Sequence, residues 1–307
     1  MDLFFITGLP KTGSSWLMNM LNDVPGIKCM GEGRFFSSGI KNIPSLFDSL
    51  NNGLGKWINY IAERKYNWFD NCLVINTIEE RNYVVDNDKE RIKEKLTKTT
   101  IRHIVNEIMI SRVGNDTQII GDKTPTTIID ELDRISNIFH DAKIIFLHRG
   151  IYDFLASFIM HFYRATKNNR PDANFECFSV KDFLQIHSFL NNESDTIITS
   201  ERLMYLIKMW REFDDRFSKT KSSNCILPVR YEELRIDTEL TLSKIVKFLI
   251  GDQYTNEIDN VIKRWDFDSK NMSSRVRSEH VNSRDLGYGE SLFNKNLRNV
   301  IDYNIKT

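Results

Sequence analysis

A glycine-rich loop near the start of the chain limits most strongly what this sequence can fold into. Leu3 to Thr7 is a short, mainly apolar run that predicts a buried strand, and Gly8–Ser15 follows it directly. From Ser14 to Leu21 apolar residues recur at helical spacing, and Pro25-Gly26 ends that segment. Backbone N–H groups in such a loop, together with the N-terminus of the helix, form a site for anions. The sequence therefore predicts a strand, an anion-binding loop and a helix.

Short apolar segments alternate with longer helical patterns along the rest of the chain. Further strands are predicted near 118–120, 143–148 and 225–229. The segment 41–70 reads as helical with loops, and helices are predicted near 88–109, 128–139, 152–164, 180–190, 200–217, 238–250 and 291–303. This alternation predicts an α/β fold with a central parallel sheet flanked by helices.

Repeats, linkers and long polar segments indicate how the chain is divided into domains. The sequence has no internal repeat or obvious linker, so we expect a single domain over residues 1–307. The polar segment 268–290 is rich in Arg and Ser. A structureless stretch of this length predicts a functional loop that covers a site.

Composition limits the partners and the compartment. Lys+Arg and Asp+Glu number 42 each, so no global field favours nucleic acid or an anionic membrane as partner. The first residues do not resemble a signal peptide, and no apolar stretch approaches the roughly 18–20 residues of a membrane helix. The four cysteines are far apart and are expected to be free thiols, and no metal-binding motif is present. We expect a cytoplasmic protein that uses no metal.

The loop is close to the phosphate-binding pattern GxxxxGK[ST] but departs from it at one position. Gly8, Gly13 and Ser15 match, whereas Ser14 stands where that pattern has its lysine. The lysine of this loop is Lys11, which would approach a phosphate chain from a different direction. The hydroxyls available to phosphate oxygens are those of Thr12, Ser14 and Ser15.

The string Pro10–Trp16 resembles the 5′-phosphosulfate loop of sulfotransferases that use 3′-phosphoadenosine 5′-phosphosulfate (PAPS). The resemblance implies a P-loop-like sulfotransferase architecture, PAPS as the sulfuryl donor, and a role for Lys11 in stabilising the departing 5′-phosphate.

A second string, after the predicted strand at 143–148, supports the same reading. An arginine at a strand end with a serine about two helical turns later can clamp one phosphate. Arg149, Asp153 and Ser157 match the family's 3′-phosphate signature, although its proline is missing here.

The resemblance assigns further cofactor contacts. Tyr231 follows the last predicted strand and would lie near the adenine, although a core tyrosine is nearly as good a reading. In the covering loop, Arg284 is the candidate for closing over the 3′-phosphate, with Arg275 and Arg277 as alternatives. The predicted cofactor-binding residues are Lys11, Thr12, Gly13, Ser14, Ser15, Trp16, Arg149, Ser157, Tyr231 and Arg284.

Sulfuryl transfer also needs a group that takes the acceptor's proton. In Lys123-Thr124-Pro125 a proline replaces the catalytic histidine of the hormone- and phenol-sulfating branch. Glu32, followed by Gly-Arg-Phe-Phe, instead resembles the glutamate base of the heparan sulfate branch. We therefore expect Glu32 as general base and Lys123 near the sulfuryl group or acceptor, with His148 and His161 as alternative bases.

The predicted function is transfer of a sulfuryl group from PAPS to a hydroxyl or amine of a small molecule, such as a metabolite or natural product. Two alternatives stay open. One is a P-loop kinase that uses ATP-Mg²⁺, because Asp122 ends a strand as a magnesium-binding acid would. The other is a nucleotide-binding scaffold without catalysis. The sequence leaves open which acceptor is used, whether oxygen or nitrogen is sulfated, and the oligomeric state.

Overall fold

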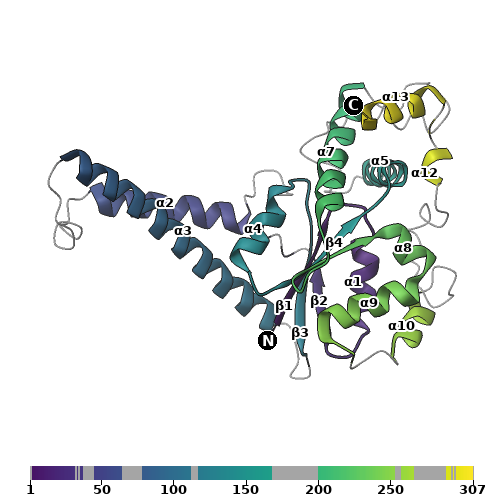
Figure 1. Ribbon diagram of the computed structural model, residues 1–307, viewed down its shortest axis with the longest axis horizontal. Helices are drawn as coiled ribbons and strands as arrows, with labels where there is room; N and C mark the ends of the chain where they lie inside the picture. Colours follow the sequence, from purple (N-terminus) through teal and green to yellow (C-terminus); the bar gives the residue numbers. More distant parts are fainter. Residues whose placement is uncertain are drawn as a thin grey trace.

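A parallel five-stranded sheet forms the centre of the protein. The computed structural model describes residues 2–31, 33, 35–36, 45–63, 78–111, 117–167, 200–252, 257–265, 288–291, 293 and 295–306. The strands are β1 (Asp2–Gly8), β2 (Ile27–Gly31), β3 (Ile119–Pro125), β4 (Lys143–His148) and β5 (Ile226–Arg230). They lie in the order β2-β3-β1-β4-β5, and all neighbouring pairs are parallel (Figure 1). The predicted α/β class is confirmed.

Helices cover both faces of this sheet. Their bounds are α1 Ser14–Asn22, α2 Leu46–Glu63, α3 Ile78–Ile110, α4 Asp130–Ile138, α5 Ile151–Lys167, α7 Ser200–Lys219, α8 Tyr231–Ile236, α9 Thr238–Ile250, α10 Ile258–Trp265, α12 Tyr288–Ser291 and α13 Lys295–Lys306. The helices α2 and α3 lie side by side and extend away from the sheet as a long arm (Figure 1). Within the described ranges, no helix combines the length and apolar character of a membrane span.

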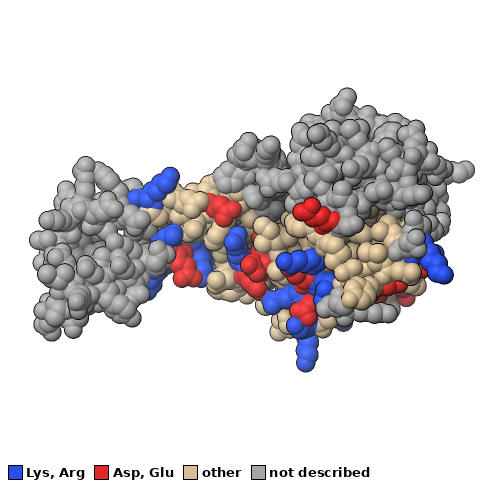
Figure 2. Space-filling view, turned by 90° about the horizontal axis from the view of Figure 1, so that it is seen from above, with Lys and Arg blue, Asp and Glu red and all other residues tan. Residues whose placement is uncertain are grey.

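Alternation along β1 explains the two-sided core. Phe4 and Ile6 pack with residues of α1, α9 and α10, whereas Phe5 packs with residues of α3, α4, α5 and α7. Successive side chains of a strand point to opposite faces, so a strand buried on both sides reads as a continuous apolar run. Charged residues of both signs are interspersed over the described part of the face in Figure 2.

The strand order predicts a ligand site at the carboxyl edge of the sheet. From β1 the chain crosses to β2 on one side, whereas β4 pairs with β1 on the other side and leads on to β5. In open parallel sheets, ligands bind outside the carboxyl ends of the strands where the connections diverge in this way. The glycine loop after β1 and Arg149 after β4 both lie at this edge.

Several elements differ from the sequence predictions. Strand β2 was not predicted, because Lys28 interrupts its short apolar run. Helix α3 begins at Ile78, ten residues before the predicted start near residue 88. The predicted helix at 180–190 and most of the covering loop at 268–290 lie outside the described residues.

Candidate active site

Two glycines give the loop after β1 its shape. Gly8 has φ +135°, and a Cβ there would lie 2.1 Å from the carbonyl oxygen of Leu147 on β4. Gly13 has φ +87°, and a Cβ there would lie 2.5 Å from the ring of Tyr231. Positive φ is inexpensive only for glycine, and neither site has room for a side chain. The loop can therefore pack against β4 on one side and Tyr231 on the other.

Lys11 also has a left-handed backbone, with φ 73°. It is the only non-glycine residue in the described part of the chain with positive φ. Such a conformation costs about 1–3 kcal/mol in a non-glycine residue and persists where the surroundings impose it. Two hydrogen bonds impose it here: the Thr12 hydroxyl donates to the Leu9 carbonyl at 2.8 Å, and Arg149 donates to the Lys11 carbonyl at 3.0 Å.

Helix α1 opens directly from this loop. The N–H of Leu17 donates to the Gly13 carbonyl at 3.1 Å, which is the first bond of the helix. The preceding N–H groups, those of Ser14, Ser15 and Trp16, belong to a first turn that has no acceptor within its own helix. Together with the positive end of the helix dipole, these donors can hold an anion. The arrangement is that of a phosphate cradle.

Lys123 reaches this cradle from β3. Its side chain is buried, and its Nζ donates to the Ser15 hydroxyl at 3.1 Å. The parallel pairing of β1 with β3, in which Ile6 lies opposite Lys123, carries the lysine to the same edge of the sheet. The structure thus brings together two predicted site residues that are 108 positions apart in the chain.

Arg149 is the buried cation of the site. It follows β4, is 4% exposed, and places its guanidinium 4.1 Å from the centre of the Tyr231 ring. Its backbone carbonyl accepts a bond from the Trp210 indole N–H at 2.8 Å, which fixes the backbone. Among the described residues, Arg149 has no carboxylate partner and its Nε has no acceptor. A buried guanidinium of this kind is set up to receive an anion.

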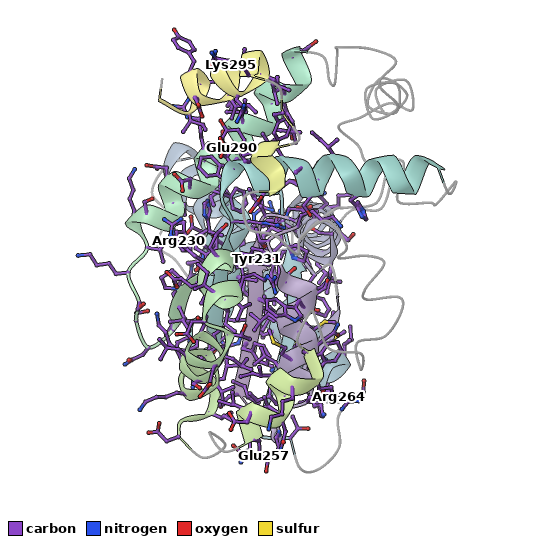
Figure 3. The ribbon with its side chains drawn as sticks, turned by 90° about the vertical axis from the view of Figure 1, so that its right-hand side faces the viewer. Arg230, Tyr231, Glu257, Arg264, Glu290 and Lys295 are labelled. Atoms are coloured by element: carbon purple, nitrogen blue, oxygen red, sulfur yellow. The ribbon has the colours of Figure 1, made fainter. Side chains whose placement is uncertain are left out.

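Tyr231 connects the loop to the arginine. It begins α8, is 2% exposed and contacts Trp16 edge to face, with ring centroids 6.4 Å apart. Figure 3 shows it in the interior, near one end of α1. Trp16 is also buried, and its indole N–H donates to the Trp265 carbonyl at 3.1 Å. Both aromatic residues therefore build the wall of the site as part of the core.

The remaining predicted residues are placed less completely. Ser157 is half-buried on α5, the helix that begins just after Arg149. Its helix leads away from the site, and among the described residues no other predicted group contacts its hydroxyl. Four predicted residues lie outside the described residues: Glu32, Arg275, Arg277 and Arg284.

The alternative base His148 is built into the core. It is 1% exposed, and its ring stacks on Phe217 at 4.8 Å and lies 5.3 Å from the ring of Trp210. Burial, and then the nearby charge of Arg230, lower its pKa from 6.5 to about 4. This packing beneath α7 favours a structural role. His161, the other alternative, is half-buried on α5.

The sequence analysis did not predict the surroundings of three buried carboxylates. Asp122 appeared only as a magnesium-binding candidate, yet it accepts a hydrogen bond from the N–H of Gly33. Asp153 accepts from the N–H of Gly289 at 2.9 Å and so docks α12 on α5. Glu131 is buried in α4. For Glu131, the only signal in the sequence was an acid beside apolar neighbours, which is also common on surfaces.

Comparisons with known proteins agree with this geometry. A model of the sulfotransferase family matches residues 4–252. The structure of mouse sulfotransferase SULT7A1 complexed with PAP (adenosine 3′,5′-bisphosphate) is similar, with TM-score 0.50 and 16% identity over 99% of this chain and 83% of that chain. A search of curated protein sequences finds no match.

Two further solved structures match with lower scores. The sulfotransferase domain of the Synechococcus PCC 7002 olefin synthase has TM-score 0.44 and 17% identity over 95% of this chain and 87% of that chain. Retinol dehydratase in complex with retinol and PAP has TM-score 0.46 and 12% identity over 99% of this chain and 80% of that chain.

At such identities a structural likeness shows the fold alone, whereas the family model spans well over half of the sequence, from β1 through α9. The chain belongs to the sulfotransferase family.

Proposed function

We propose that this protein transfers a sulfuryl group from PAPS to a hydroxyl or amine of a small acceptor, such as a metabolite or natural product. One observation carries the proposal: Arg149 is buried, is bonded to the carbonyl of Lys11, and has no carboxylate partner among the described residues. PAPS offers two separate anionic groups, one for this arginine and one for the loop. The mouse sulfotransferase with the same fold is complexed with PAP.

The residues of the site fit such a donor. The first turn of α1, with the hydroxyls of Ser14 and Ser15, would hold the 5′-phosphosulfate. Arg149 would pair with the 3′-phosphate, helped by Ser157 and Arg284, and Tyr231 would lie near the adenine. The positive charge would come from Lys11 and Lys123, so we propose no role for a metal.

The reaction is an in-line displacement. A bond forms between the acceptor oxygen or nitrogen and sulfur, while the bond from sulfur to the 5′-phosphate oxygen breaks. We assign the acceptor's proton to Glu32, and Lys11 would stabilise the charge that develops on the departing phosphate. Positioning and charge stabilisation dominate such loose transfers, as in phosphoryl transfer.

The kinase alternative is disfavoured by the surroundings of Asp122. This carboxylate is 0% exposed, and both its oxygens already accept hydrogen bonds, from Gly33 and from Thr124. A magnesium ligand needs an oxygen that can face the nucleotide. The cytoplasmic location and the single domain predicted from the sequence stay predictions.

The test is turnover with PAPS and a panel of hydroxyl and amine acceptors, followed as release of PAP. Lys11→Ala should remove most of the turnover and leave the protein folded, because the charge on the departing phosphate loses its partner. Lys219→Ala is the matched control, since this exposed lysine pairs with Asp215 one turn earlier in α7. Turnover near the wild-type level in Lys11→Ala would refute the assignment of the loop.

The base is tested separately. Glu32→Gln should lower kcat by ~10²–10⁴-fold, the usual contribution of a general base, with little change in PAP affinity. An unchanged kcat would move the base to another residue.

A further inference from the structure

A fully buried carboxylate lies at the carboxyl end of β3. Asp122 is 0% exposed, in a sheet whose two faces are both covered by helices. A carboxylate in such a place is tolerated only with hydrogen-bond donors around it. Its Oδ1 accepts from the backbone N–H of Gly33 at 2.8 Å, and its Oδ2 accepts from the Thr124 hydroxyl at 2.5 Å.

The contact with Gly33 is closely packed. A Cβ at Gly33 would lie 2.5 Å from the ring of Phe35 and 3.1 Å from Asp122 Oδ1. Phe35 is itself buried, so the ring has little freedom to move away. The peptide of Gly33 is therefore held between an aromatic ring and a carboxylate, and its position depends on both.

Side chains at the carboxyl end of β3 make contacts on both faces of the sheet. Because side chains alternate along a strand, Lys123 points to the face opposite that of Asp122 and Thr124. Lys123 contacts Ser15 in the cofactor loop, whereas Asp122 holds Gly33. Neighbouring side chains of β3 thus contact both the first turn of α1 and the backbone of Gly33.

We propose that Asp122 is a positioning residue for catalysis: it fixes the Gly33 peptide and, through it, the adjacent Glu32. The inference rests on the proposed function, in which Glu32 takes the acceptor's proton. Asp122 does not touch the reacting groups. A displacement of about 1 Å at a catalytic group can lower the rate ~10²-fold, so loss of this hydrogen bond should be visible in kcat.

The experiment compares Asp122→Ala with Asp122→Asn. The alanine variant loses the acceptor for the Gly33 N–H, whereas asparagine keeps its Oδ1 and can donate to Thr124 instead. We expect kcat to fall ~10²-fold in Asp122→Ala and to return to within about threefold of wild type in Asp122→Asn, with PAP affinity unchanged in both. Equal impairment of the two variants would overturn the inference.

A double variant tests the route through Glu32. If Asp122 acts by placing that base, Asp122→Ala should lower kcat no further when Glu32→Gln is already present. Additive losses would overturn the inference, as would a wild-type kcat in Asp122→Ala when Glu32→Gln is impaired.

The control variant changes another carboxylate that accepts a hydrogen bond from a backbone N–H. Asp237 accepts from Leu240 at 3.0 Å at the start of α9. Asp237→Ala should lower Tm without lowering kcat, which separates loss of stability from loss of positioning.

A last readout is independent of turnover and keeps the two proposals distinguishable. Hydrogen exchange of the Gly33 amide, measured by NMR, should be faster in Asp122→Ala than in wild type or Asp122→Asn. Equal exchange in all three would overturn the inference. Absence of any transfer from PAPS in the wild-type enzyme would instead refute the proposed function.

Discussion

Glu131 makes the stability of the fold depend on pH in a way that can be measured. The side chain lies in the first turn of α4 and is 1% exposed. Its Oε2 has no hydrogen-bond partner among the described residues. Burial is the main cause that raises the pKa of this carboxyl from 4.5 to about 7, opposed by the hydroxyl of Thr126 and the charge of Arg134.

The direction in which stability changes with pH follows from the number of protons that each state binds. Between pH 4.5 and about 7, the folded state keeps a proton on Glu131 that the unfolded state has released. The contribution of Glu131 to stability therefore falls as the pH rises through this range and is lowest above pH 7. Each pKa unit corresponds to about 1.4 kcal/mol, so the shift amounts to about 3 kcal/mol of unfolding free energy.

Glu131→Gln removes this dependence. The amide has the shape of the protonated acid and never ionises, so the variant should match wild type near pH 4.5. It should exceed wild type by about 3 kcal/mol at pH 8. Urea unfolding of both proteins across this range measures the difference. A difference that does not change with pH would refute the reasoning, because it would mean that Glu131 has the same pKa in the folded and the unfolded protein.

His148 acts in the opposite direction over nearly the same range. Because its folded pKa, about 4, lies below the ordinary 6.5, the unfolded state binds a proton that the folded state does not. Its contribution to stability is lost as the pH falls from 6.5 to 4. In wild type the pH dependences of stability that come from Glu131 and His148 offset each other between pH 4.5 and 6.5. The loss of stability on acidification that His148 causes should therefore be clear only in Glu131→Gln.

Three further predictions concern single contacts. His148→Phe should flatten the acid limb of the stability curve, and a limb as steep as that of wild type would assign it to other groups. Gly13→Ala should cost about 1–2 kcal/mol from the left-handed backbone alone, and more from the contact with Tyr231, in urea unfolding; a neutral change would contradict the φ of +87°. Tyr152→Phe removes the 2.5 Å hydrogen bond to Asp302 on α13 and should lower stability by about 1 kcal/mol; increased proteolysis near the C-terminus would locate the loss, and an unchanged cleavage rate would contradict it.

Local patterns were sufficient to predict the main features of the fold. The apolar run of β1, the glycines after it and the helical spacing of α1 all lie within about twenty consecutive residues. Each of them constrains the backbone directly. Arg149 could be predicted for the same reason, because it follows an apolar strand without interruption. Strand β2 could not, since Lys28 leaves its five residues without a continuous apolar run.

The contacts that complete the site depend on distant parts of the chain. Lys123 meets Ser15 only because β3 lies beside β1, and Asp122 meets Gly33 across 89 positions. A sequence shows an acid beside a lysine but not that a strand sends the two to opposite faces of a particular sheet. The stacking of Arg149 on Tyr231 likewise requires that β4 and β5 are neighbours.

Binding of PAP tests the central claim, that this site is built for a nucleotide with a separate 3′-phosphate. Thermal unfolding would be followed with PAP, with AMP and with ATP-Mg²⁺, in wild type and in Arg149→Ala. A ligand at ~100 times its Kd adds about 2.7 kcal/mol of apparent stability. We expect PAP to raise the Tm of the wild-type protein, and AMP and ATP-Mg²⁺ to leave it unchanged. In Arg149→Ala, PAP should no longer raise the Tm. A rise with ATP-Mg²⁺ and none with PAP would contradict the account and favour a kinase.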